Sequence, residues 1–266
     1  MSLIPLSFIS ALLYLIGGAA QAVSLTGKGG ERRTLVLGAG AAAVLFHTLA
    51  VYYVLHPGGG IQLGFFPIAS LVAWLVAGLV LISSLKKPLS NLFVAVFPLA
   101  AVTVLLAVLA PQTASPKPLS GGMVLHVLSS ILAYSIFAIA AFQALLLAAQ
   151  DRQLKHHHTR GIVRALPPLQ VMERLLFEML WTAMALLSLS LVTGALVIED
   201  LFAQHLVHKT VLSLTAWVIY AIVLYGRHQR GWRGIAAVRW TLGGFVMLML
   251  AFFGSKFMLE LVFQTT

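Results

Sequence analysis

Long apolar stretches alternate with short polar loops along the whole chain. Eight stretches are each long enough to cross a bilayer as a helix, for which roughly 20 residues are needed. They lie at residues 4–25, 34–55, 63–84, 92–110, 122–149, 175–198, 208–226 and 238–262. The pattern predicts an all-α fold, a polytopic transmembrane helix bundle that forms a single integral membrane domain over residues 1–266. No large soluble domain is expected.

The basic residues fall in alternate loops. Of the 17 Lys and Arg residues, 14 lie in the loop with Lys28, Arg32 and Arg33, in the Lys86–Lys87 pair, in residues 151–174 and in Arg227–Arg239. The positive-inside rule therefore predicts that these loops are cytoplasmic and that both termini face outward. The longest loop, about 150–174, is expected to be a solvated hinge between a five-helix and a three-helix part. The first span reads as an uncleaved helix, because its basic residues follow it.

Composition supports a membrane protein and removes several function classes. Hydrophobic residues make up 60% of the chain and charged residues 9%, too little polar surface to cover a soluble globule. The absence of cysteine excludes disulfides, thiolate catalysis and iron–sulfur ligation. Walker, Rossmann and HExxH patterns are also absent, so we do not expect an enzyme. The basic residues lie in short loops between apolar spans, as topology determinants do, so we do not expect a nucleic-acid partner.

The acidic residues give little sign of a proton pathway. Glu178 is expected to pair with Arg174 or Lys155, and Glu260 with Lys256 four residues earlier. A proton-coupled transporter would need a carboxylate at mid-membrane, and none is obvious. Inverted repeats are not visible either.

Histidine is the residue type that stands out. Five of the nine histidines lie in or beside apolar helices on the side predicted to face outward: His47, His56, His126, His205 and His208. Imidazoles within a membrane are costly, which favours a haem or metal site. His47 is expected about 13 Å deeper than His56, at about 1.5 Å per residue. It could instead bond a neighbouring helix, and His56 beside Pro57 fits a solvated turn.

The sequence around His126, running from His126 to Ser135, resembles the start of the histidine-bearing helix in CcsA-type cytochrome c assembly proteins. Residues 208–217 and 224–228, the Gly231-Trp-Arg-Gly234 motif and residues 252–254 follow the order of that family's closing helices. The resemblance covers roughly residues 60–262 and is strongest to a shorter branch of eight-helix inner-membrane proteins, YpjD- and HemX-like.

The resemblance implies a bacterial inner-membrane protein of cytochrome c biogenesis that handles haem. Its partners would be the lipid bilayer, haem and other cytochrome-biogenesis membrane proteins. His126 matches the family's first outward histidine and would be one axial ligand of the haem iron. The other candidate ligands are His208 first, then His205 and His47.

The chain departs from the family pattern on the same side. A Trp-rich outward segment ending in Trp-Asp is missing, since residues 201–207 contain no Trp and His208 stands about where the Asp would be. The second outward histidine falls near Phe263, and a cytoplasmic one falls near Tyr225. Two other functions therefore stay open: a small-solute transporter, and a HemX-like membrane regulator or scaffold without haem.

Overall fold

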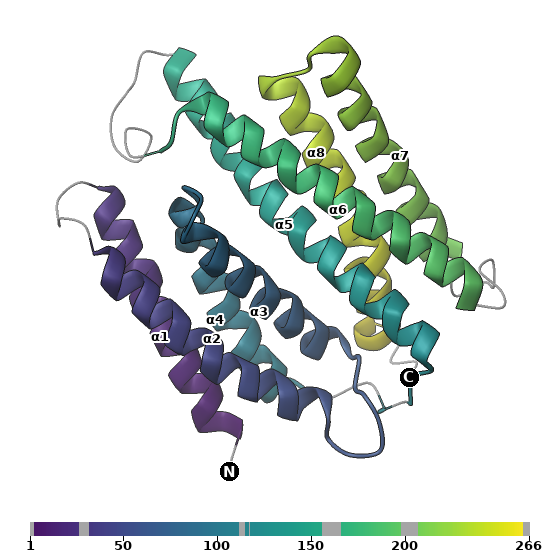
Figure 1. Cartoon of the computed structure of the whole chain (residues 1–266). Coiled ribbons are helices and arrows are strands. Elements are labelled where there is room, and N and C mark those ends of the chain that lie inside the picture. Colours follow the sequence, from purple (N-terminus) through teal and green to yellow (C-terminus); the bar gives the residue numbers. More distant parts are fainter. Residues whose placement is uncertain are drawn as a thin grey trace. The chain divides into compact units, whose positions relative to one another are not determined.

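A computed structural model describes residues 3–26, 32–111, 115–116, 118–155, 166–197 and 207–262 (Figure 1). Within these ranges, eight helical spans are long and apolar enough to cross a membrane, which confirms the predicted all-α transmembrane fold. The long helices are α1 (Leu3–Leu25), α2 (Arg33–Leu55), α3 (Phe65–Ser84), α4 (Phe93–Leu109), α5 (Gly121–Lys155), α6 (Leu169–Val197), α7 (Val207–Arg230) and α8 (Gly234–Met249). A 3₁₀ turn, η1 (Ser90–Leu92), precedes α4, and two π-helical segments, η3 (Leu250–Gly254) and η4 (Phe257–Val262), continue α8.

Large apolar side chains cover the outside of the helices. Leu45, Ile82, Trp181 and Leu196 are each more than half exposed. Such side chains would be unfavourable in water, so this surface is suited to the hydrocarbon of the bilayer. Eight crossings return both termini to one side of the membrane, and the positive-inside rule assigns that side as the outer one.

Helices α5 and α6 run beyond the apolar stretches that predicted them. Helix α5 continues to Lys155, and α6 begins at Leu169, so both reach into the loop expected at 150–174. Polar residues continue α5 because Lys155 pairs with Asp151 one turn earlier, at 2.7 Å. The tract His156–His158 lies outside the described residues.

The helices form two compact units of four, unit one with α1–α4 and unit two with α5–α8. The expected division into five and three helices was wrong, because α5 packs on α6 and α8. Its apolar stretch resembles the others, so hydropathy alone gave no sign of its packing partners. The prediction of a single membrane domain remains a prediction.

Unit one is a ring of four antiparallel neighbours. Helix α1 packs on α2 and α4, and α3 packs on the same two helices. The Phe97 ring of α4 occupies the centre, stacked on Phe93 with ring centroids 4.5 Å apart. Gly17 of α1 and Gly40 of α2 border this ring, and a Cβ at Gly40 would lie 2.7 Å from it. The two glycines thus make room for one aromatic side chain.

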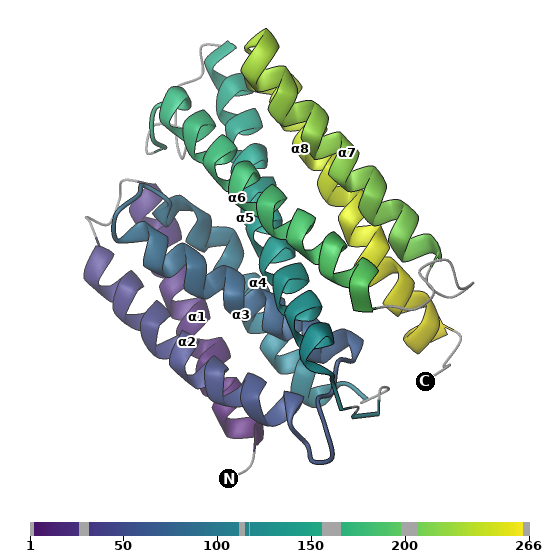
Figure 2. The same cartoon turned by 45° about the vertical axis from the view of Figure 1, so that its right-hand side comes forward.

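Unit two has the same cyclic order, with α5 between α6 and α8 and with α7 beside α8 (Figure 2). Phe137 of α5 stacks on Tyr220 of α7 with ring centroids 3.9 Å apart. Tyr220 also lies against Gly244 of α8, where a Cβ would be 2.8 Å from its ring. Its hydroxyl donates to the Thr241 carbonyl oxygen at 3.3 Å. Three helices are therefore held together around Tyr220.

Several helix glycines allow another helix to approach closely. Gly17, Gly18, Gly194 and Gly244 all have a side chain of another helix within 4 Å of the position a Cβ would take. Gly243 has nothing within that distance. The adjacent Gly244 points at Tyr220 instead.

Candidate functional site

His126 is held in one orientation at the predicted outer end of unit two. It lies near the start of α5, and its Nδ1 atom is 2.8 Å from the backbone carbonyl oxygen of Ser190 in α6. A carbonyl oxygen can only accept a hydrogen bond, so Nδ1 carries the proton and donates it. In the neutral imidazole, Nε2 then carries a lone pair. This is the form in which histidine binds metal ions.

Packing reinforces this orientation. A Cβ at Gly194 of α6 would lie 2.8 Å from Cε1 and 2.9 Å from Nδ1 of His126, so the imidazole rests directly against the glycine backbone. Ser130, one turn along α5, donates its hydroxyl proton to the His126 carbonyl oxygen at 2.6 Å or shares a hydrogen bond with the Ser190 hydroxyl. Helices α5 and α6 are therefore fixed to each other around the His126 ring.

Among the other predicted ligands, only His208 lies in the described part of unit two. His208 is exposed in the first turn of α7, and His205 lies outside the described residues. The part of the chain that the structure describes contains no group of three or more His, Cys, Asp and Glu residues placed to hold a metal ion. A haem iron requires only two axial side chains, so this finding bears on clustered metal sites alone.

His47 belongs to unit one and is completely buried there. Its Nδ1 lies 3.2 Å from the Tyr14 hydroxyl of α1, and its Nε2 lies 2.9 Å from the Ser70 hydroxyl of α3. Both ring nitrogens are hydrogen-bonded, so a bond to iron would require one of these contacts to break. The expectation that His47 bonds a neighbouring helix was correct in kind, although the partners are two side chains and no backbone carbonyl.

The remaining predicted polar residues have local roles. His56 is exposed and its Nδ1 bonds the Tyr52 carbonyl of its own helix at 3.0 Å. Glu178 faces Arg174 at 3.6 Å on an exposed helix surface, as one of the two expected pairings. Neither residue points to a binding site.

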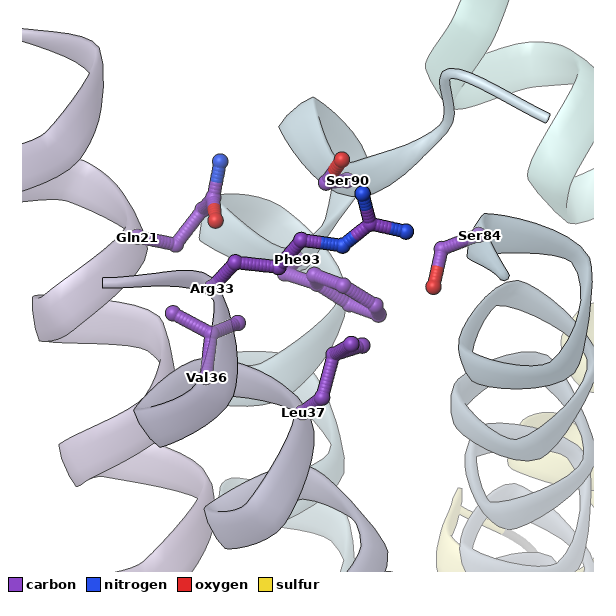
Figure 3. A pocket seen from close by; sticks show the side chains of 7 residues that line it. All are labelled: Gln21, Arg33, Val36, Leu37, Ser84, Ser90 and Phe93. Atoms are coloured by element: carbon purple, nitrogen blue, oxygen red, sulfur yellow. The ribbon is translucent and has the colours of Figure 1, made fainter. Parts of the chain in front are cut away.

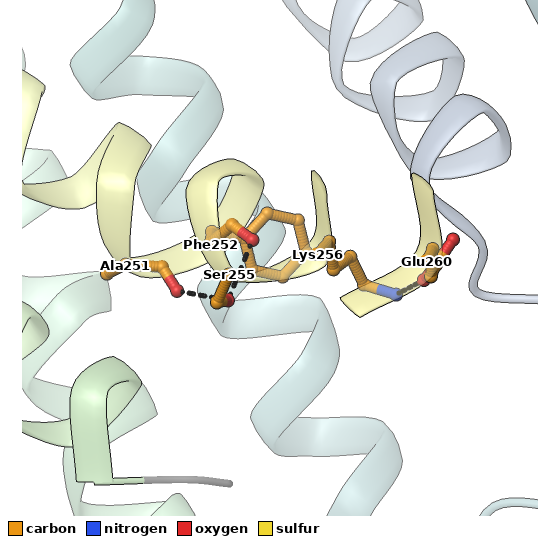
Figure 4. Close-up of polar contacts among 5 residues, drawn as sticks. All are labelled: Ala251, Phe252, Ser255, Lys256 and Glu260. Carbon is orange, nitrogen blue, oxygen red and sulfur yellow. Dashed lines mark hydrogen bonds and ion pairs between the residues drawn. The ribbon is translucent and has the colours of Figure 1, made fainter. Parts of the chain in front are cut away.

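The extension of α8, residues 250–262, carries a mostly buried ion pair (Figure 4). Lys256 donates to Glu260 at 2.9 Å, as the spacing of four residues predicted, and the side chains are only 17% and 10% exposed. Lys209 of α7 lies within electrostatic range of both. Sequence spacing gave no sign of Lys209, because it lies on a different helix.

The same extension carries the π-helical turns. The Ser255 hydroxyl donates to the Ala251 and Phe252 carbonyl oxygens, at 2.8 and 3.1 Å (Figure 4). Phe252 and Phe253 both lie against Tyr134 of α5, with ring centroids 6.1 and 5.4 Å apart. π-Helical turns are often found near functional sites. The π-helical turn at Phe252 and Phe253 contacts α5 at Tyr134, about two turns along the helix from His126.

Glu173 is a buried acid that the sequence reasoning missed. It is 6% exposed in α6, and its carboxyl oxygen accepts the backbone N–H of Gly234, the first residue of α8. Gly231 and Gly234 take positive φ angles of 63° and 56°, and between them Trp232 lies against Gly226. The Gly231-Trp-Arg-Gly234 motif therefore forms the turn between α7 and α8. The available signal was a carboxylate beside an apolar run, five residues before Glu178.

The chain also matches a known protein family. The family model described as cytochrome C assembly protein matches residues 35–263, which is most of the chain and includes α5–α8. The chain belongs to the cytochrome c assembly protein family. As a member with eight membrane-spanning helices, it is an integral protein of the inner membrane.

Its relatives include proteins of similar length. The inner membrane protein YpjD of Escherichia coli strain K12 is 29% identical over 259 residues, covering 96% of this chain and 98% of YpjD. An uncharacterized 28.8 kDa protein of Azospirillum brasilense is 31% identical over 59% of this chain and 60% of its own length. Protein HemX of Brevibacillus brevis is 27% identical over 48% of each chain. No solved structure matches the chain.

Proposed function

We propose that this protein binds haem at the predicted outer end of unit two, with His126 as one axial ligand, and serves cytochrome c assembly without catalysing a reaction itself. One observation carries the proposal: Nδ1 of His126 donates to the Ser190 carbonyl, which leaves Nε2 to bind iron. Membership of the cytochrome c assembly family makes haem the group to which this lone pair is best matched.

The residues around His126 fit a haem ligand in three respects. The imidazole is partly exposed, so its free edge can be reached. Its orientation is fixed by a hydrogen bond and by contact with Gly194, which reduces the ordering that ligation requires. A backbone carbonyl on the opposite nitrogen also raises the basicity of the ligating one. When bound, haem would supply a redox-active iron, and the protein would position and shield it.

The second axial ligand is proposed from the start of α7. His208 is exposed on the first turn of α7, at the same end of unit two as His126, and His205 precedes it by three residues. Helix α7 packs on α6, the helix to which His126 is bonded. His47 is less suitable, because Tyr14 and Ser70 occupy both of its ring nitrogens.

The experiment is an absorption spectrum of the purified full chain after titration with haem. We expect a Soret band with the sharp features of bis-histidine ligation in the native sequence, and its loss or shift in His126→Ala. His208→Ala and His205→Ala identify the second ligand. His56→Ala is the matched control, since this histidine is exposed but bonds only its own helix.

The outcomes separate the proposal from its rivals. A chain without a Soret band, or an unchanged band in His126→Ala, would reject the proposed ligand. Accumulation of a solute in vesicles under an ion gradient would favour a transporter. Co-purification of a partner that survives loss of all the outer histidines would favour a HemX-like regulator or scaffold.

A further inference from the structure

A small pocket opens at the end of unit one opposite the outer side. Seven residues line it: Gln21, Arg33, Val36, Leu37, Ser84, Ser90 and Phe93. They come from the last turns of α1 and α3, the first turns of α2 and α4, and η1 (Figure 3). All four helices of the unit therefore contribute to one pocket, at the membrane boundary that the positive-inside rule assigns to the cytoplasm.

The pocket combines a basic entrance with an apolar floor. In Figure 3 the Arg33 guanidinium extends across the pocket between Ser90 and Ser84. Arg33 is exposed, whereas Val36 and Phe93 beneath it are almost completely buried. A guanidinium presents a planar fork of N–H groups, the arrangement that binds phosphate oxygens in pairs. The entrance thus favours a phosphate and the floor favours hydrocarbon.

A second polar side chain of the pocket also favours an anionic ligand. Gln21 lines the pocket although it is only 9% exposed, and no hydrogen bond joins its amide to another of the described residues. Its amide atoms are not fully buried, so a ligand or water that enters the pocket can complete their hydrogen bonds. Its NH₂ group and the Ser90 hydroxyl are donors that an anion can use. The Ser84 hydroxyl instead donates to the Leu81 carbonyl oxygen at 2.7 Å, so Ser84 contributes shape.

The surrounding charge favours an anion. Residues 26–33 and 84–91 contain five basic residues and one acidic residue: Lys28, Arg32, Arg33, Lys86, Lys87 and Glu31. Lys28 and Glu31 lie outside the described residues, so the charge placed by the structure is that of Arg32, Arg33, Lys86 and Lys87. Helix α2 begins at Arg33, and its N-cap residue Arg32 supplies no side-chain hydrogen bond to the first turn. The free N–H groups and the positive end of the helix dipole add to the attraction.

We propose that this pocket binds the phosphate of an anionic phospholipid of the inner leaflet, with the guanidinium of Arg33 on the phosphate and the glycerol end of the acyl chains beside Leu37. The apolar floor selects a lipid over a soluble phosphate. The neighbouring basic residues select an anionic headgroup over a zwitterionic one, whose positive charge they would repel. The lipid would connect the ends of all four helices of unit one.

The test is native mass spectrometry of the purified full chain, delipidated and titrated with phosphatidylglycerol or phosphatidylcholine. We expect one phosphatidylglycerol molecule to bind more tightly than phosphatidylcholine. Arg33→Gln should weaken that binding about fivefold or more, the order of effect of one basic side chain at an anionic lipid surface. Ser84→Leu, which fills the pocket and keeps the guanidinium, should weaken it as well.

Arg32→Gln is the matched control, because it removes the same charge one residue outside the pocket. Equal losses in Arg32→Gln and Arg33→Gln would overturn the proposal in favour of a diffuse basic surface. Displacement of phosphatidylglycerol by millimolar inorganic phosphate would overturn the lipid as the ligand. If Arg33→Gln unfolds, which circular dichroism would reveal, an unchanged affinity in Ser84→Leu would still reject the pocket.

Discussion

Glu173 of α6 accepts a hydrogen bond from the backbone N–H of Gly234, the residue with which α8 begins. A side chain from one helix thus caps the N-terminus of another. The carboxyl group is buried, and α8 begins without a side-chain cap from its own N-cap residue, Arg233. This contact ties α6 to the turn that joins α7 and α8.

Removing this cap should destabilise unit two. We expect Glu173→Ala to lower the free energy of unfolding by about 1–3 kcal/mol, because it leaves the helix N-terminus without its partner. Chemical denaturation in detergent, followed by circular dichroism, measures the change. Glu178→Gln is the control, since the exposed pair with Arg174 should contribute less than about 1 kcal/mol. Equal losses in both variants would contradict the assigned role.

Gly194→Ala should displace the imidazole of His126. The added Cβ would lie less than 3 Å from two ring atoms, and the ring cannot retreat without lengthening its hydrogen bond to Ser190. We expect the variant to fold with weaker haem affinity and a shifted Soret maximum. Gly243→Ala on α8 is the control, because no atom lies within 4 Å of that Cβ. A native spectrum in Gly194→Ala would show that the ring orientation is unimportant for ligation.

His47→Ala should destabilise unit one while leaving the Soret band unchanged. The substitution removes a fully buried ring and leaves the Tyr14 and Ser70 hydroxyls without a partner. The expected loss is about 2–5 kcal/mol, from the cavity and the unpaired groups together. Thermal unfolding measures it, and a double-mutant cycle with Tyr14→Phe gives the share of that hydrogen bond. Loss of the Soret band in a folded variant would restore His47 as a ligand.

Gly231→Ala should strain the turn between α7 and α8. Gly231 has φ 63°, a conformation that costs other residues roughly 1–2 kcal/mol. We expect a stability loss of about 1 kcal/mol. Gly38→Ala in α2 is the control, because it has helical geometry and open space around its Cβ, and should be neutral or stabilising. Hydrogen exchange at the start of α8 would report the loss locally.

Hydropathy predicted all eight spans because lipid imposes the same requirement on each of them. It located the helix ends less well. Helix α5 runs on to Lys155 through residues that pair along the helix surface, and such pairs leave no trace in an apolarity profile. The grouping of α5 with α6 and α8 could not be predicted either, since it depends on which small and aromatic side chains meet, as Tyr134 of α5 and Phe245 of α8 do.

The sequence predicted the candidate ligand His126 but not the groups that surround it. The motif around His126 identified the histidine, but its proton position depends on Ser190, which is 64 residues away. His47 could not be distinguished from a ligand by sequence, because a buried imidazole occurs in both cases. Only the contacts to Tyr14 and Ser70 reveal that both of its nitrogens are engaged.

The division into two units of four helices bears on how the protein is made. Four crossings return the chain to the side of the membrane on which it began, so unit one is finished as soon as α4 has been inserted. Its helices pack mainly on one another, and domains generally fold in the order of synthesis. A closed four-helix body can therefore form in the bilayer before α5–α8 have been inserted. Insertion of the first half then requires neither haem nor the helices that would hold it.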